Sequence, residues 1–178
     1  EIYTLSLHDA LPILVIFAHA HSSAGARFIE AGKTQTINFY ELLLRIDGGE
    51  ERHPVHLVDL PGYGYAKVSR DSRKVWAKFI EEYFLHAEEL RFVCLLLDIR
   101  HIPMDSDRRM FAWLVEHDIP VLVIATKADK IGKNARRAQI AAIRKALGVE
   151  ELTILPYASP KNEGRSELLD VMKEYLLE

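Results

Sequence analysis

The feature that most constrains the fold is the stretch Val55-His56-Leu57-Val58-Asp59-Leu60-Pro61-Gly62, a short apolar run that ends in an acid, with a Gly three positions later. A run of this length is typical of a buried strand. An Asp at the carboxyl end of a strand can hold Mg²⁺ through water, and a Gly just beyond it lets a backbone N–H approach a phosphate oxygen. Because Asp-x-x-Gly is also ordinary turn chemistry, the motif gains its meaning from the rest of the chain.

A second apolar run, residues 121–125, leads into Thr126-Lys127-Ala128-Asp129, about 67 residues further along the chain. In this order, the Asp-x-x-Gly and Thr-Lys-x-Asp motifs look like the metal-binding and guanine-reading elements of a GTPase. The two motifs together therefore indicate a nucleotide site at the ends of two strands.

Strands and helices alternate along most of the chain, and a turn at residues 47–50 predicts one hairpin with an antiparallel strand. This pattern predicts an α/β fold with a mostly parallel sheet, whose functional residues lie at the carboxyl ends of strands. Asp59, Asp129 and Ser159 fall at such ends. The predicted strands are residues 14–18, 37–46, 55–60, 91–98, 121–125 and 152–155, and the predicted helices are residues 69–87, 105–118, 133–147 and 163–177.

Length and composition narrow the class of protein. The chain has 178 residues, which fits one domain, and a net charge of −3, which gives no global basic field for nucleic acid. The single cysteine, Cys94, lies in an apolar run and predicts a small buried side chain, with no intramolecular disulfide, as suits the cytoplasm. No apolar run reaches the roughly 18 residues of a membrane span.

The predicted helix at residues 133–147 is basic and amphipathic. A basic row of this kind is either an ordinary solvated face or a local patch that meets RNA. We favour the solvated face, and the RNA patch stays open as the alternative. The basic residues are Lys133, Arg136, Arg137, Arg144 and Lys145.

Gly32-Lys33-Thr34 has the ending of a phosphate loop but not its spacing. The loop requires G-x-x-x-x-G-K-[ST], and Arg27 stands where the first Gly is needed. The residues that follow predict a strand, whereas such a loop opens a helix. Thr34 could instead give its oxygen to Mg²⁺, as the first switch of a GTPase does.

Residues 1–13 resemble the translation of a sequencing adapter joined to a reading frame. They have neither the basic region nor the cleavage site of a signal peptide. We therefore expect residues 1–31 to be a foreign or degraded segment, and residues 32–178 to form a partial G domain.

Three runs, residues 32–39, 59–67 and 126–129, together resemble the EngB (YihA/YsxC-type) GTPases of the TrmE–Era–EngA–EngB group. The resemblance implies a three-layer phosphate-loop GTPase-type fold, with one antiparallel edge strand, in a monomeric cytoplasmic protein that binds GTP or GDP with Mg²⁺ and stays out of the membrane. It further implies GTP hydrolysis during assembly of the large ribosomal subunit, whose precursor RNA and proteins would be the partners, and a link to cell division and septation.

The resemblance also assigns roles to residues, although it assigns no certain catalytic residue. Thr34 and Asp59 would hold Mg²⁺, and Asp129 would accept hydrogen bonds from guanine N1 and N2, which rejects adenine. The Lys127 stem would pack on the base plane. The other implied contacts are Gly32, Lys33, Gln35, Thr36, Leu60, Pro61 and Gly62 around the phosphates, Thr126, Ala128 and Tyr157 beside the base, and the Ala158 and Ser159 N–H groups facing guanine O6.

Two departures from the family pattern matter. Tyr63 stands where Ras-like enzymes keep a water-orienting Gln, which predicts slow intrinsic hydrolysis unless a partner supplies catalytic groups. The phosphate loop and its helix do not precede Gly32. We therefore expect the first strand of the family to be missing or replaced, with Phe17 and Ala18 as its last trace. We also expect GTP binding to be impaired. The alternative is a nucleotide-independent module that docks on ribosomal RNA or protein. A phosphate-loop kinase fits less well, because it has no use for Thr-Lys-x-Asp.

Overall fold

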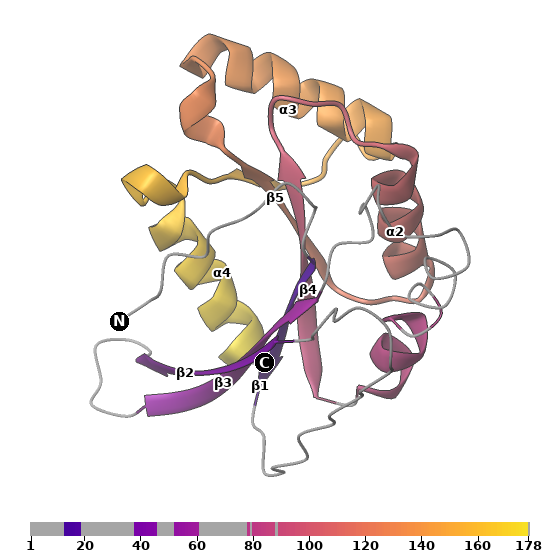
Figure 1. Ribbon diagram of the computed structural model, residues 1–178, viewed down its shortest axis with the longest axis vertical. Helices are drawn as coiled ribbons and strands as arrows, with labels where there is room; N and C mark the ends of the chain where they lie inside the picture. The colour runs from indigo at the N-terminus through magenta and orange to yellow at the C-terminus, as the bar shows by residue number, and fades with distance from the viewer. Residues whose placement is uncertain are drawn as a thin grey trace, which may run out of the picture.

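The structure is a computed structural model, and it describes residues 13–18, 38–45, 52–60, 78, 80–87 and 89–177. Among these residues the strands form one sheet in the order β2-β3-β1-β4-β5-β6 (Figure 1). No helix in these ranges is long and apolar enough to cross a membrane. The strands are β1 (Ile13–Ala18), β2 (Asn38–Arg45), β3 (Arg52–Leu60), β4 (Leu90–Asp98), β5 (Val121–Thr126) and β6 (Ile154–Pro156).

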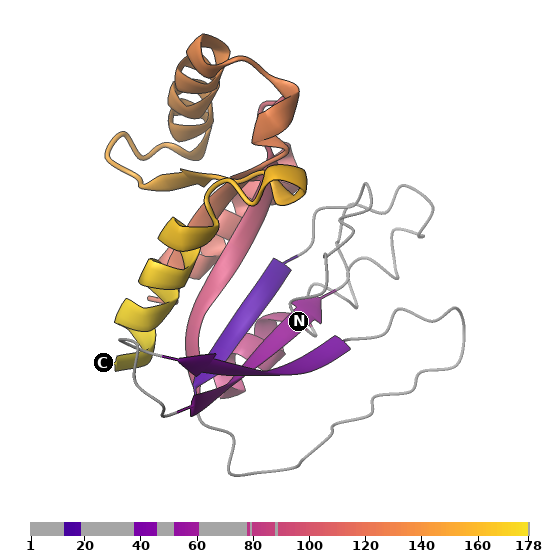
Figure 2. The same cartoon turned by 90° about the vertical axis from the view of Figure 1, so that its left-hand side faces the viewer.

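Helices cover both faces of the sheet, which gives three layers (Figure 2). One face packs against α2 (Asp105–Glu116), α3 (Lys133–Leu147) and the helical residues 80–86, and the other packs against α4 (Arg165–Leu177). Side chains of β4 alternate between the two cores, because successive strand residues point to opposite faces. The predicted three-layer α/β fold is confirmed.

Local signals in the sequence explain where the helices begin and end. The Met104 N–H at the start of α2 donates to the Asp107 carboxylate at 2.8 Å, which satisfies a backbone donor that the helix leaves free. The last turn of α3 is followed by Gly148 at φ 76°, a left-handed conformation that glycine adopts without steric cost.

The strand directions follow the prediction except at β1. Strands β4, β5 and β6 are parallel, and β2 pairs antiparallel with β3 at the edge of the sheet, as the predicted hairpin requires. However, β1 lies between β3 and β4 and is antiparallel to both. The prediction of one antiparallel strand is therefore incomplete, because a central strand also runs in the opposite direction.

The direction of β1 decides which edge of the sheet its two ends reach. Ile13 pairs with Leu60 near the carboxyl end of β3, and Ala18 pairs with Val55 towards its amino end. The carboxyl end of β1 therefore lies towards the edge opposite to Asp59. The division of the chain at residue 31 stays a prediction, and the part of residues 1–31 that the structure describes is β1.

Candidate functional site

Thr126 joins the carboxyl ends of β4 and β5. It lies opposite Asp98 in the parallel register, and its side-chain hydroxyl donates to the Leu97 carbonyl oxygen at 3.0 Å. The Ile99 N–H donates in turn to the Thr126 carbonyl oxygen at 3.0 Å. Thr126 is only 6% exposed, so its hydroxyl is committed to the protein interior. These bonds fix the point at which the chain leaves β5.

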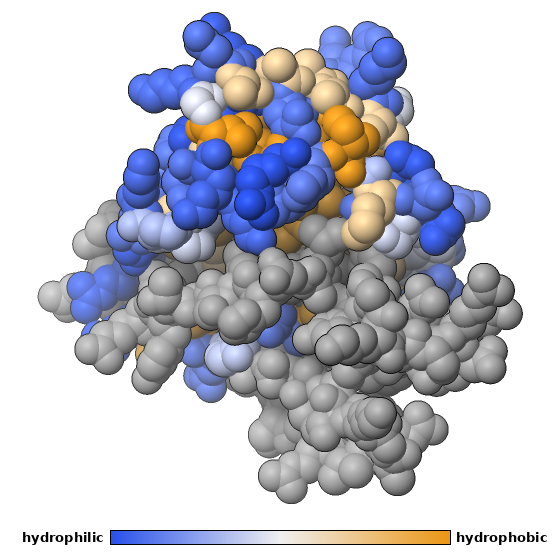
Figure 3. Space-filling view, turned by 45° about the horizontal axis from the view of Figure 1, so that its top comes forward, coloured by the Kyte–Doolittle hydropathy of each residue, from blue (hydrophilic) through white to orange (hydrophobic). Residues whose placement is uncertain are grey.

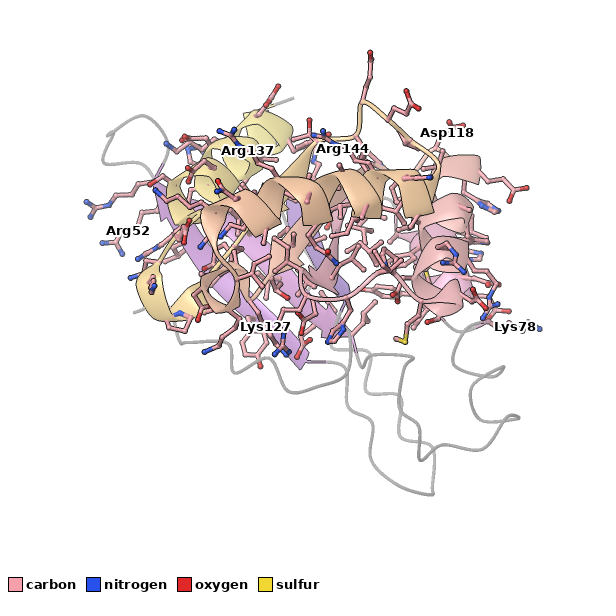
Figure 4. All side chains as sticks on the ribbon, turned by 90° about the horizontal axis from the view of Figure 1, so that it is seen from above. Arg52, Lys78, Asp118, Lys127, Arg137 and Arg144 are labelled. Carbon is pink, nitrogen blue, oxygen red and sulfur yellow. The ribbon has the colours of Figure 1, made fainter. Side chains whose placement is uncertain are left out.

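Lys127, the next residue, has a left-handed backbone with φ 59° and ψ 31°. This conformation costs a residue other than glycine about 1–2 kcal/mol. The surroundings hold it in place, because the Ala128 N–H donates to the Tyr157 carbonyl at 3.0 Å and the Tyr157 N–H donates to the Ala125 carbonyl at 2.8 Å. Strain that is over-determined in this way is typical of functional sites. Lys127 lies at the carboxyl edge of the sheet (Figure 4).

The Lys127 ammonium contacts Asp98, the last residue of β4. Its Nζ lies 3.2 Å from Asp98 Oδ2, and Arg100 donates to the same carboxylate from Nε at 2.9 Å and from Nη2 at 2.6 Å. Partial burial alone would raise the pKa of Asp98, but the hydrogen bonds from Arg100 and Lys127 hold the pKa far below its usual range. The carboxylate therefore stays ionised at physiological pH.

Asp129 lies in the short helix η1 (Ala128–Lys130), and its side chain is 8% exposed. Lys130 Nζ lies 3.2 Å from Asp129 Oδ2. Desolvation would raise the pKa of Asp129, but the hydrogen bond from Lys130 and the charges of Lys130 and Lys161 lower it overall. An ionised carboxylate at a strand end can accept two hydrogen bonds from one ligand edge.

The loop after β6 brings a second group of predicted residues to the same place. It contains the short helix η2 (Ser159–Lys161) and is joined to β5 through Tyr157. The Ala158 N–H donates to the Glu163 carbonyl at 3.0 Å, whereas the Ser159 N–H has no backbone acceptor in the described part of the chain. The predicted contacts of Ala158 and Ser159 with guanine O6 stay predictions.

Asp59 lies near the carboxyl end of β3 but not level with Thr126. Leu14 of β1 pairs with both Asp59 and Cys94, and Cys94 stands four residues before Asp98, the partner of Thr126. Asp59 therefore lies about 13 Å short of the level of Thr126 along the strands, and three strand spacings, about 14 Å, from β5 across the sheet. A ligand that contacts both Asp59 and the Thr126–Asp129 turn must be elongated.

Several predicted site residues lie outside the described residues, and the structure adds two that the sequence analysis did not single out. Asp98 and Arg100 follow the apolar run at residues 92–97. The one signal in the sequence that could have indicated them is the position of an acid, Asp98, at the end of that run. Within the described ranges, no group of three His, Cys, Asp or Glu side chains could hold a metal ion. The predicted residues outside those ranges are Gly32, Lys33, Thr34, Gln35, Thr36, Pro61 and Gly62.

The fold has three layers, and the Thr126–Asp129 turn lies at one edge of its sheet. Together they are typical of an α/β domain of the GTP-binding class. Comparison with protein-family models gives no match. The chain is 41% identical over 149 residues to the probable GTP-binding protein EngB of Lachnospira eligens, covering 83% of this chain and 66% of that protein. It is 43% identical over 145 residues to that of Syntrophomonas wolfei, covering 82% of this chain and 70% of that protein. The chain belongs to the EngB family of GTP-binding proteins.

Two further comparisons agree with this assignment. The chain is 44% identical over 139 residues to the probable GTP-binding protein EngB of Shouchella clausii, covering 78% of this chain and 66% of that protein. The chain thus spans about two thirds of the length of the curated relatives that it matches. A crystal structure of a probable GTP-binding protein engB is similar to it, with a TM-score of 0.58, 17% identity and coverage of 76% of this chain and 83% of that one, which supports the fold alone.

Proposed function

We propose that this chain is the base-reading part of a guanine-nucleotide-binding GTPase. The observation that carries the proposal is the Thr126–Asp129 turn, in which an ionised, mostly buried carboxylate stands beside a strained Lys127 at the carboxyl edge of the sheet. Asp129 accepts from guanine N1 and N2, the Lys127 stem packs on the base, and the Ser159 N–H donates to guanine O6. Adenine offers neither the two donors nor the oxygen.

Mg²⁺ fits the other end of this site. Asp59 supplies a carboxylate oxygen at the carboxyl end of β3, and oxygen ligands are the kind that Mg²⁺ prefers. Thr34 would supply a second oxygen, with Gly62 meeting the γ-phosphate. Mg²⁺ bound through one or two protein oxygens and the substrate phosphates does not need a three-residue cluster. The ion would neutralise charge on the phosphates during hydrolysis.

The wider role in this proposal rests on the family resemblance. We infer slow intrinsic hydrolysis, because Tyr63 cannot orient water as an amide does, and a partner that restores the rate by roughly 10³ to 10⁵. The partner is part of a precursor of the large ribosomal subunit. The proposal further includes a cytoplasmic monomer whose switch is linked to cell division and septation.

The test of base reading is Asp129→Asn. In a chimera that carries a complete phosphate loop before residue 32, this variant should move preference from GTP towards xanthosine triphosphate, because Asn can donate to the extra oxygen of xanthine. Charge-assisted hydrogen bonds are worth roughly 1.5–3 kcal/mol each, so losing two should lower GTP affinity at least about a hundredfold. Competition titration with both nucleotides measures the change.

Asp118→Asn is the matched control. Asp118 is exposed in the turn between α2 and β5, and its φ of 53° is one that Asn also tolerates. This variant should leave both affinities unchanged. If Asp129→Asn keeps the GTP preference of the parent chimera, Asp129 does not read the base and the proposal fails.

A second candidate function is RNA docking without nucleotide, and one observation on α3 favours it. The helix contains no acidic residue, and hydrophilic side chains lie among hydrophobic ones on the face of the molecule that Figure 3 shows. Arg136 is paired with Glu163, and Arg144 donates to the Leu152 carbonyl at 2.7 Å, so both have structural roles. The exposed basic residues Lys133, Arg137 and Lys145 are four or eight positions apart and form one row.

Replacing that row by glutamine tests this candidate. If Lys133, Arg137 and Lys145 each contact a phosphate of a ribosomal RNA transcript, the slope of log affinity against log salt should fall by about 2, at roughly 0.7–0.9 per contact. The control replaces Arg45, Arg52 and Arg109, which are also exposed, and removes the same charge elsewhere. Equal losses from the two triple variants would show that RNA responds only to net charge and would exclude α3 as a docking face.

A further inference from the structure

We propose that Asp98, held by Arg100, is a positioning residue that fixes the Lys127 ammonium and thereby keeps the Lys127 stem in place as a platform for the guanine base. This inference rests on the proposed function, because it deepens the account of the same site. It adds the end of β4, which no predicted contact included, to the parts of the chain that determine base binding.

The first support is the geometry of the Asp98 carboxylate. Arg100 occupies both of its oxygens, from Nε to Oδ1 at 2.9 Å and from Nη2 to Oδ2 at 2.6 Å, and the Arg100 N–H also donates to Oδ1 at 3.0 Å. A two-point guanidinium contact sets the plane of a carboxylate as well as its position. The remaining approach to Oδ2 is taken by Lys127 Nζ at 3.2 Å.

The second support is the rigid frame beneath these side chains. Asp98 and Thr126 are neighbours in the parallel register, and Ile99, which is fully buried, donates its N–H to the Thr126 carbonyl. The backbone atoms that carry Asp98 and Lys127 are therefore held at a fixed separation. The left-handed conformation of Lys127 accompanies this contact, and its side chain is 28% exposed, so part of the stem is open to solvent.

The consequence for binding is entropic. A lysine side chain has several rotatable bonds, and a ligand that packs on a free lysine must order it on binding. When Asp98 already orders the ammonium in the ligand-free protein, the free energy of binding no longer includes the loss of side-chain conformational entropy of Lys127. The full rotamer entropy of a lysine corresponds to about a thirtyfold change in affinity, so we expect a loss of about tenfold to thirtyfold without Asp98.

The experiment compares the 178-residue chain with Asp98→Ala. The first measurement is the NMR order parameter of the Lys127 Nζ group without nucleotide, which should be high in the parent chain and lower in the variant. The second is titration with guanosine monophosphate, with adenosine monophosphate as the non-cognate probe. Chemical shifts of residues 126–129 should respond to the guanine nucleotide, at concentrations about ten to thirty times higher in the variant.

Two further variants keep the result decisive. Asp105→Ala removes an exposed carboxylate that is also paired with an arginine, Arg108, and should change neither measurement. Arg100→Gln leaves Asp98 in place and should loosen the Lys127 ammonium partly, which provides a second variant if Asp98→Ala does not fold.

The outcomes separate the two ideas. If the Lys127 ammonium stays ordered in both Asp98→Ala and Arg100→Gln, the positioning role is overturned. It is also overturned if the ammonium loses its order in Asp98→Ala while the affinity for guanosine monophosphate stays unchanged. If the parent chain responds equally to both monophosphates, the proposed function fails, while a loss of ammonium order on removing Asp98 still supports the positioning contact.

Discussion

A polypeptide of these 178 residues is expected to bind GTP with Mg²⁺ about 10³ to 10⁶ times more weakly than the same chain with a complete phosphate loop. Such a loop supplies several backbone N–H donors and a Lys to the phosphates. Charge-assisted hydrogen bonds are worth roughly 1.5–3 kcal/mol each, so the loss of three removes about 5–9 kcal/mol. Asp129 would still read the base, but base and metal contacts alone seldom hold a triphosphate.

The direction of β1 supports the same expectation. A phosphate loop must leave its strand on the side of the sheet towards which the carboxyl ends of β3 and β5 point. Ala18, the last residue of β1, pairs with Val55, so the strand ends towards the opposite edge of the sheet. A chain that leaves β1 there does not start beside the phosphates.

Isothermal titration of this polypeptide with Mg²⁺ and GTP measures the difference. The control is a chimera in which residues 1–31 are replaced by the corresponding segment of a relative that carries G-x-x-x-x-G-K-[ST]. Micromolar binding by the unaltered polypeptide would contradict the prediction and would mean that some other segment, such as residues 18–25, cradles the phosphates.

The second large effect is expected from Gly164→Ala, in the turn before α4. Gly164 has φ 82°, and a Cβ at this position would lie 2.3 Å from the Pro156 carbonyl oxygen and 3.3 Å from the Tyr157 Cα. Both contacts are with backbone, which cannot rotate away as a side chain can. Left-handed strain of about 1–2 kcal/mol and overpacking of about 1–3 kcal/mol together predict a loss of about 2–5 kcal/mol in unfolding free energy.

Gly148→Ala separates the two contributions. Gly148 has a similar φ of 76°, but a Cβ there would meet nothing within 4 Å. This variant should lose only the strain, about 1–2 kcal/mol. Urea unfolding of both variants gives the comparison, and equal losses would show that the contact with Pro156 relaxes without cost. A larger loss from Gly164→Ala would show how tightly the Ser159 loop is packed against the end of β6.

The sequence predicts where the Thr126–Asp129 turn lies in the fold, because the rule that places it is local. A buried run followed by Thr126-Lys127-Ala128-Asp129 places those residues at a strand end, and parallel strands bring their carboxyl ends to one edge. The same rule places Ser159 after the end of β6 and Asp59 near the carboxyl end of β3. These positions depend only on where strands stop, which the change from apolar to polar residues makes visible.

Other parts of the site depend on relations that the sequence does not display. Residues 13–18 have the same apolar pattern in either direction, so periodicity could not show that β1 runs antiparallel to its neighbours. The contact of Asp98 with Lys127 accompanies a left-handed backbone at a lysine, which composition does not predict. The hydrogen bond from the Ala158 N–H to the carbonyl of Glu163, five residues later, depends on a turn that periodicity does not display either.

The hydrogen bonds around Thr126 bear on the speed of ligand capture. The hydroxyl bond to Leu97 and the bond from the Ile99 N–H tie Thr126, at the start of the turn, to the end of β4, and the two backbone bonds of Tyr157 tie the turn to the end of β6. The turn therefore acquires its shape when the chain folds. Association rates fall when binding must wait for a conformational change. In the proposed function, a guanine base therefore binds to a turn that already has its final conformation. Its association rate is then set by diffusional encounter and orientation, and not by rearrangement of the turn.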